Sequence, residues 1–178
     1  MLATDRSLER NDYVAGPSAS RMGRVNESDL EWTEYDDGEA RFDRKQLAEA
    51  AGGEEIGCSL YELPPESRSW PFHYHTANEE AIYVLEGTGS LRLEDETLSI
   101  RAGDYVTFPA DESGGHRVIN DTDEPLRYLA ISTMNEPDVT VYPEMNTLGV
   151  FVGAPPGGRG DRSIHGYYDL DDEVDYWE

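Results

Sequence analysis

Short segments in which apolar and polar residues alternate fill most of the chain between Ile56 and Val152. Alternation with a period of two is typical of strands that bury one face. The segments recur at the close spacing typical of all-β domains, and no helix-length segment separates them. This pattern predicts an all-β fold, either a sandwich or a barrel.

The clearest predicted strands have well-marked ends. "IGCSLYEL" is stopped by two prolines, and "AIYVLEG" ends at a glycine. "SLRLE" and "TLSI" are expected to form a hairpin. Five further segments are predicted strands, the last two of them short: "DYVTFP", "HRVIN", "LRYLAIST", "VTVYP" and "LGVFVG".

We divide the chain into three parts: an N-terminal arm at 1–54, a β-barrel core at 55–135, and C-terminal strands with an acidic tail at 136–178. The arm is expected to hold a short strand around Leu30 to Tyr35. A helix is predicted from Asp43 to Ala51, with Asp43 as its N-cap and a glycine pair as its end. The Gly- and Pro-rich tail is expected to consist of a linker and a segment that packs loosely or on a neighbouring subunit.

The chain is strongly acidic, with 38 Asp and Glu against 14 Lys and Arg and a net charge of −24. This charge repels nucleic acid and anionic membranes, so neither is an expected partner. A disordered acidic protein is the alternative, but aromatic and β-branched residues are too dense in the strand region. The carboxylate-rich surface with a single lysine, Lys45, resembles that of halophile proteins, whose charges are screened by molar salt.

The single cysteine, Cys58, excludes an internal disulfide framework and is expected to be a small buried apolar residue. The first residues, "MLATDRSLERND", show no secretory signal. No apolar run is long enough for a transmembrane helix. A cytoplasmic protein is therefore expected.

Two of the four histidines, His73 and His75, are two residues apart. On a strand, side chains with this spacing point to the same face. Glu80 opens the next predicted strand and shares a face with Ile82 and Val84. A carboxylate on that core-facing column needs a cation or hydrogen-bond donors to offset its burial.

His116 lies far downstream and shares a strand face with Val118. Three imidazoles and one carboxylate can therefore converge in a barrel. This ligand set suits Mn, Fe, Co, Ni, Cu or Zn, and not Ca or Mg, which prefer oxygen ligands. Glu79 is expected to point away from Glu80's face. The alternative for any single histidine is an ordinary polar residue on an exposed strand.

The spacing of these residues resembles the two motifs of the cupin superfamily, over about residues 55–135. The first motif is matched by His73, His75, Glu80 and Gly87. The second is matched by Gly103, Pro109, His116 and Asn120. Two features depart from the motifs: Ser67 stands where a glycine usually begins the first one, and the loop "ADESGG" of the second one is longer than usual.

The resemblance implies a double-stranded β-helix, or jelly roll, with metal ligands at His73, His75, Glu80 and His116. A divalent transition metal held there leaves open positions for water or substrate. Cupins include dioxygenases, isomerases or epimerases, decarboxylases and lyases. They also include proteins that bind a small molecule without turning it over.

The first hypothesis is therefore a metal-dependent enzyme acting on a small polar or sugar-derived metabolite. The alternative is a metal-assisted binding or sensing protein. A purely structural barrel is the third hypothesis. Whether the chain is an enzyme stays open at this point. Glu79, Tyr74 and Tyr105 are weak candidates for proton transfer, and His165 in the tail is expected to be solvated.

Several neighbouring residues have two possible roles. Trp70 and Phe72 either pack in the core or form a wall of the substrate site. Arg117 and Arg127 are expected to form surface ion pairs, and binding of an anionic ligand is the alternative.

A homodimer is expected, because small cupins bury one sheet face against a partner. The alternate face of "AIYVLEG", with Ala81, Tyr83 and Leu85, is apolar enough to need cover.

Overall fold

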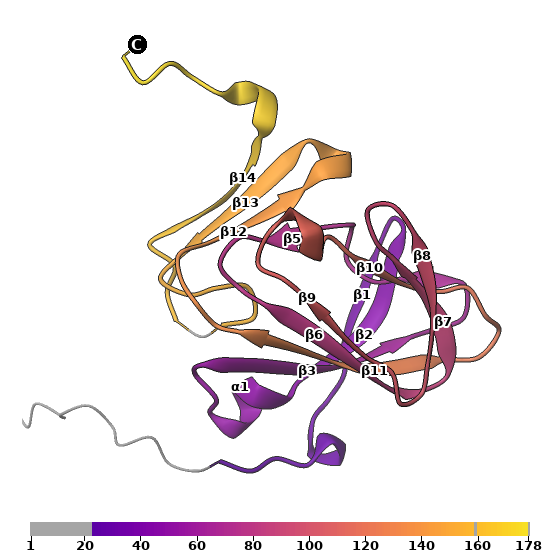
Figure 1. Ribbon diagram of the computed structural model, residues 1–178. Coiled ribbons are helices and arrows are strands. Elements are labelled where there is room, and N and C mark those ends of the chain that lie inside the picture. Colours follow the sequence, from indigo (N-terminus) through magenta and orange to yellow (C-terminus); the bar gives the residue numbers. More distant parts are fainter. Residues whose placement is uncertain (1–22, 159, 178) are drawn as a thin grey trace, which may run out of the picture.

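The computed structural model describes residues 23–158 and 160–177, whose strands form two sheets. The larger sheet has the order β8-β7-β10-β4-β2-β3-β11-β6-β9, with β1 paired to β2, and the smaller has the order β14-β13-β12-β5. Figure 1 shows the large sheet curled below the small one. The predicted all-β class is confirmed.

The large sheet consists of β1 (Thr33–Asp37), β2 (Ala40–Gln46), β3 (Ile56–Leu63), β4 (Ser67–Arg68), β6 (Glu80–Glu86), β7 (Thr88–Arg92), β8 (Thr97–Arg101), β9 (Tyr105–Phe108), β10 (Arg117–Asn120) and β11 (Leu126–Thr133). The small sheet consists of β5 (Tyr74–His75), β12 (Asp138–Tyr142), β13 (Thr147–Val152) and β14 (Ile164–Asp169). The helical segments are α1 (Leu47–Ala51) and the 3-10 turns η1 (Glu27–Asp29), η2 (Glu112–Gly114), η3 (Pro143–Met145) and η4 (Leu170–Asp172). In the described part of the chain, no helix has the length and apolar character needed to cross a membrane.

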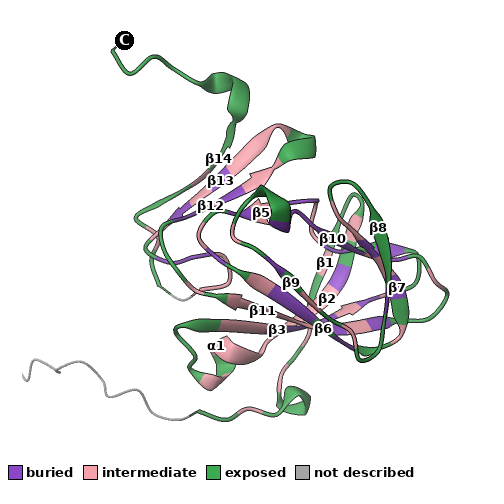
Figure 2. Cartoon of the chain, in the orientation of Figure 1, coloured by how far each residue is buried: buried purple, intermediate pink, exposed green. Residues whose placement is uncertain are grey.

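The core lies on the face of the large sheet that the alternation predicts. Figure 2 shows buried residues along the strands of this sheet. On β6, Ile82 and Val84 are buried, whereas Tyr83 and Leu85 are 39% and 42% exposed. Ala81 is covered within the chain itself, so only part of the expected apolar outer face is open. Burying a large apolar side chain contributes roughly 1.5–3 kcal/mol. The buried cluster consists of Phe42, Tyr61, Leu63, Ile82, Val84, Leu91, Ile100, Phe108, Val118, Leu126 and Tyr128.

The predicted helix from Asp43 to Ala51 is wrong in its first half. Strand β2 continues to Gln46, which precedes the short helix α1, and Asp43 caps nothing. The reason is tertiary: Phe42 is fully buried in the core, and β2 lies between β4 and β3 in the sheet. Strand pairing and burial here override local helix propensity. The helix does end at Gly52, whose left-handed φ of 82° favours glycine.

The C-terminal tail contains more regular structure than expected. Strand β14 pairs antiparallel with β13 over its whole length, with Phe151 opposite His165. Most β14 side chains are exposed, so backbone hydrogen bonds rather than burial hold it. A strand of this kind lacks the alternation that reveals strands in a sequence.

The two sheets meet at the segments that carry the histidines. Strand β5 joins the small sheet through Thr140, which pairs with His75. Two residues before His75, His73 forms an antiparallel bridge with His116, just before β10 of the large sheet. This junction brings the two distant sequence motifs together.

Candidate metal centre

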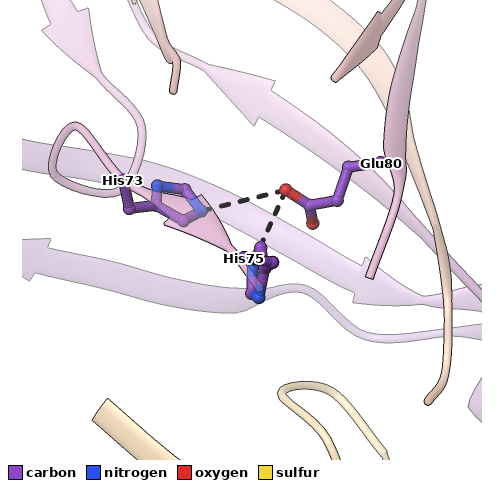
Figure 3. Close-up of side chains that lie close together, drawn as sticks. All are labelled: His73, His75 and Glu80. Carbon is purple, nitrogen blue, oxygen red and sulfur yellow. Dashed lines mark ion pairs between the residues drawn. The ribbon is translucent and has the colours of Figure 1, made fainter. Parts of the chain in front are cut away.

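The four side chains that the sequence singles out lie together in the structure. The Nε2 atoms of His73, His75 and His116 lie 3.9, 3.6 and 3.6 Å from Oε2 of Glu80. Ligand atoms of His73, His75 and Glu80 all lie within 4.8 Å of one another, which makes this trio a candidate metal site. Figure 3 shows both imidazoles turned toward the Glu80 carboxylate.

Backbone carbonyls fix the orientation of two imidazoles. Nδ1 of His73 lies 2.8 Å from the carbonyl oxygen of Pro71, and Nδ1 of His116 lies 2.9 Å from that of Gly114. A carbonyl oxygen only accepts, so each Nδ1 carries a proton and donates it. Each Nε2 then presents a lone pair to the site, as a metal ligand must.

A carboxylate orients the third imidazole. Nδ1 of His75 lies 2.6 Å from Oδ2 of Asp138 and 3.1 Å from Oγ1 of Thr140. The backbone N–H of Ala77 donates to the other oxygen of Asp138. Burial alone raises the pKa of Asp138, but the hydrogen bond and charge of His75 outweigh it and lower that pKa. Burial lowers the pKa of His75, but Asp138 and the charge of Glu80 outweigh it and raise that pKa.

The other two histidines stay neutral more readily. Burial lowers the pKa of His73 well below its ordinary value, and the neighbouring His116 and His75 add to this effect. Burial likewise lowers the pKa of His116. Neutral imidazole is the form that binds a metal. Among the described residues, no Lys or Arg pairs with Glu80, so the carboxylate lacks a permanent positive partner. The donor set therefore fits a divalent transition metal.

The longer loop before His116 still delivers that residue to the site. A Cβ on Gly114 would lie 2.0 Å from the carbonyl oxygen of Pro109, so only glycine fits where the loop turns back. Asp111 accepts a hydrogen bond from the backbone N–H of Ser113 and stabilises the turn. The ring of Phe108 stacks on His116 with centroids 3.6 Å apart, which holds the imidazole plane.

Three of the four side chains line a cavity, and His116 is not part of its described wall. His73, His75 and Glu80 line a cavity of about 600 Å³, which is within the usual size range of small-molecule sites. Trp70 lines it as well, and its Nε1 donates to the hydroxyl of Tyr61. The second predicted wall residue, Phe72, is buried and is not part of the described cavity wall.

The C-terminal strands contribute cavity residues that were not predicted from the sequence. Tyr142 lines the cavity and stacks on His73 with ring centroids 5.8 Å apart, and burial raises its pKa above the ordinary value. His165, expected to be solvated, is exposed but also lines the cavity. The alternation in "VTVYP", which places Thr140 and Tyr142 on one face, is the signal that points to Tyr142.

The earlier candidates for proton transfer lie elsewhere. Glu79 is exposed, Tyr105 is 61% exposed, and neither they nor Tyr74 belong to the described cavity wall. Glu79 is thus exposed, whereas Glu80 lines the cavity, as the alternation predicts.

Arg117 and Arg127 form ion pairs, as expected, and Asn120 has a structural role. Arg127 pairs with Glu27 at 2.9 Å, and Arg117 pairs with Glu39 at 3.1 Å, although Arg117 itself is buried. Asn120 is fully buried, and its Nδ2 donates to the carbonyl oxygens of Leu63, Pro64 and Glu124. It therefore ties loops together away from the cavity.

Comparisons with known proteins agree with this architecture. Residues 59–132 match the family model of the cupin domain. A candidate sugar phosphate isomerase from Acidithiobacillus ferrooxidans is 30% identical, with a TM-score of 0.66 over 78% of this chain and 83% of that chain. A cupin sugar phosphate isomerase from Silicibacter pomeroyi is 26% identical, with a TM-score of 0.65 over 74% of this chain and 78% of that chain.

A third similar structure is the polyketide cyclase RemF from Streptomyces resistomycificus. It is 25% identical, with a TM-score of 0.55 over 64% of this chain and 80% of that chain. The alignments to two curated relatives span only 46% and 36% of their lengths. The fold is the double-stranded β-helix that the two motifs predict.

Proposed function

The chain belongs to the cupin superfamily, and we propose that it is a metal-dependent isomerase acting on a small polar, sugar-derived metabolite. One observation carries the proposal: three Nε2 atoms surround the Glu80 carboxylate at the wall of an open cavity. A purely structural barrel has no need of such a set, because buried titratable groups cost stability unless they are compensated.

His73, His75, Glu80 and His116 would hold the metal, with Mn, Fe, Co, Ni, Cu and Zn all compatible with this donor set. A bound divalent ion would supply Lewis-acid polarisation of a substrate carbonyl or hydroxyl oxygen. The hydrogen bonds at each Nδ1 keep the imidazoles oriented, so little reorganisation is needed when a substrate enters.

The remaining task in an isomerisation is to move a proton between neighbouring carbons or oxygens. Tyr142 stands next to His73 in the cavity, and its raised pKa keeps the phenol protonated, so it can donate a hydrogen bond to the substrate oxygen on which negative charge develops. Tyr167, whose ring centroid lies 6.1 Å from that of Tyr142, lines the same cavity. Together with Trp70, these tyrosines give the cavity wall an aromatic surface against which a bound metabolite would pack.

The similar structures support the choice of reaction class. Two of them carry the name of sugar phosphate isomerases, and both align with about three quarters of this chain, at 78% and 74%. The proposal extends that chemistry to this chain as a class and does not name a particular sugar.

The test is proton exchange during turnover. Metal-loaded protein would be incubated in D₂O with a panel of small aldoses, ketoses and their phosphates, and followed by proton NMR. We expect deuterium to enter the carbon next to the carbonyl, together with interconversion of one aldose–ketose pair. The Tyr142→Phe variant should lose most of this exchange while it keeps its metal. Tight binding of a metabolite with no exchange and no conversion would favour the binding or sensing function instead.

A further inference from the structure

We propose that Arg44 forms an anion subsite in the cavity and binds an oxyanion, a phosphate or a carboxylate, carried by the metabolite. That the anion belongs to a substrate rests on the proposed function, whereas the anion site itself does not.

Arg44 points into the interior. It follows Phe42 by two residues on β2, so both side chains lie on the same face, and Phe42 is fully buried. Nε of Arg44 donates to Oγ of Ser59 at 3.1 Å, and the guanidinium lies 5.6 Å from the centroid of the Tyr61 ring. These contacts hold the side chain against the cavity wall, to which Arg44 belongs.

Arg44 forms no ion pair with a carboxylate of the described residues, although the chain is very acidic. Within the described residues, four other arginines form ion pairs with Asp or Glu: Arg68, Arg92, Arg117 and Arg127. Arg44 forms none there; its Nε donates to Ser59, and its guanidinium lies beside the Tyr61 ring. Its two terminal nitrogens are therefore left to bind an oxyanion, for which the planar fork of arginine is well suited.

The tail leaves room for such a ligand. A Cβ on Gly157 would lie 3.0 Å from Nη2 of Arg44, so glycine at this position keeps the guanidinium uncrowded. A second cation, Arg162, lines the cavity, but its nitrogens donate to the carbonyl oxygens of Ala154 and Pro155, each at 2.9 Å. Arg162 thus adds positive potential while it holds the tail loop in place.

Acidic residues also line the cavity, namely Glu49, Glu54, Glu80 and Glu136. Glu136 accepts a hydrogen bond from the backbone N–H of Gly153. Because of these carboxylates, the cavity as a whole does not have a positive potential that would attract an anion. Direct hydrogen bonds from Arg44 have to select it.

The anion subsite is separated from the candidate metal site along the sheet. Strands β2, β3, β11 and β6 are successive neighbours. Arg44 lies opposite Tyr61, and the pairing continues through Tyr128 to Val84, which is four residues along β6 from Glu80. Both side chains line one continuous cavity. A metabolite whose oxyanion contacts Arg44 would therefore extend toward Glu80 with its other end.

The experiment measures anion binding without any turnover. Metal-free protein would be titrated calorimetrically with inorganic phosphate and, separately, with acetate, at the lowest KCl concentration that keeps its native circular-dichroism spectrum. Three variants are compared with the wild type: Arg44→Gln, Arg44→Lys and Arg41→Gln. Arg41 is the matched control, because it lies on the same strand, is exposed and points the other way.

We expect Arg44→Gln to weaken binding of the preferred anion about ten-fold, as expected for loss of a charged hydrogen-bond donor. Arg44→Lys should restore part of the affinity, and Arg41→Gln should leave it unchanged. The tighter of the two probes identifies the anion as a phosphate or a carboxylate. No measurable binding of either anion by the wild type, or equal affinities in the wild type and Arg44→Gln, overturns the proposal.

This result is independent of the metal site. If Arg44→Gln loses phosphate while the wild type neither holds metal nor catalyses exchange, the anion site stands and the proposed function fails. If metal and exchange are present but Arg44→Gln binds both anions like the wild type, only the anion site fails.

Discussion

His75 and Asp138 form a buried hydrogen-bonded pair, with 2.6 Å between Nδ1 and Oδ2. The two residues belong to β5 and β12, which are neighbours in the small sheet. This contact ties an imidazole of the first cupin motif to a strand beyond the second motif. The candidate metal centre thus depends on residues outside the 59–132 segment that matches the cupin family model.

Replacing Asp138 by Asn should weaken metal binding. The amide keeps the size of the side chain but loses the charge that orients His75 and makes it more basic. Changes in such supporting residues typically reduce metal affinity by about 10–100-fold. Competition titration with a fluorescent chelator measures this effect. Asp121→Asn is the control, because Asp121 accepts a hydrogen bond from Ser90 on the exposed surface. Equal metal affinity in both variants would show that the Asp138 carboxylate plays no part.

The same pair predicts a pH window for the stability of the metal-free protein. The folded-state pKa of Asp138 is lowered from 3.8, so its stabilisation is lost as the pH falls below that value. The folded-state pKa of His75 is raised from 6.5, so its stabilisation is present below 6.5 and is lost as the pH rises through the raised value. The unfolding free energies of the wild type and Asp138→Asn should differ most between these limits. Urea unfolding at several pH values tests this, and a difference that does not vary with pH would contradict it.

The net charge of −24 predicts stabilisation by salt. At low ionic strength the carboxylates repel one another, whereas at 1 M salt the Debye length is only about 3 Å. The melting temperature should rise steeply between about 0.1 and 2 M KCl, because the repulsion between carboxylates is strongly screened at molar salt. Sorbitol at equal osmolarity separates screening from solute exclusion. A melting temperature that rises equally in both solutes would assign the effect to exclusion.

The exposed aromatic face of β6 and β9 predicts a homodimer. Tyr83 pairs in register with Tyr105, and these side chains are 39% and 61% exposed. Light scattering after gel filtration in molar KCl should give twice the chain mass of 20.0 kDa. Tyr83→Glu should shift the protein to monomers, because it places a charge in the apolar face. Ile56→Glu on β3 is the matched control, since Ile56 is a 62% exposed apolar residue on another strand. A wild-type monomer at all concentrations would rule out the dimer.

Much of the fold could be predicted because its strands bury one face. Period-two alternation identifies β3, β6 and β11, and it separates inward Glu80 from exposed Glu79. The histidine spacing adds the site, because residues two apart on a strand share a face. The convergence of His116 with the first motif follows from the resemblance to a known fold.

The remaining parts depend on contacts between distant segments. The segment from Asp43 to Gln46 has helix-forming neighbours, but it continues as a strand because Phe42 is buried and β2 pairs inside the sheet. The support of His75 by Asp138 joins residues 63 positions apart, and no local pattern marks it. The same holds for Arg44: that it forms no ion pair within residues 23–158 and 160–177 is visible only when the cavity is assembled.

The central claim is that Glu80, with the three histidines, binds a transition metal. The most direct measurement is the metal content of untagged protein purified in molar KCl, determined by inductively coupled plasma mass spectrometry on wild type, Glu80→Gln and Glu79→Gln. We expect about one transition-metal ion per chain in the wild type and in Glu79→Gln, and a large loss in Glu80→Gln with the fold intact. A wild type that carries no transition metal and takes none up, or a Glu80→Gln variant that retains the full content, would contradict the claim.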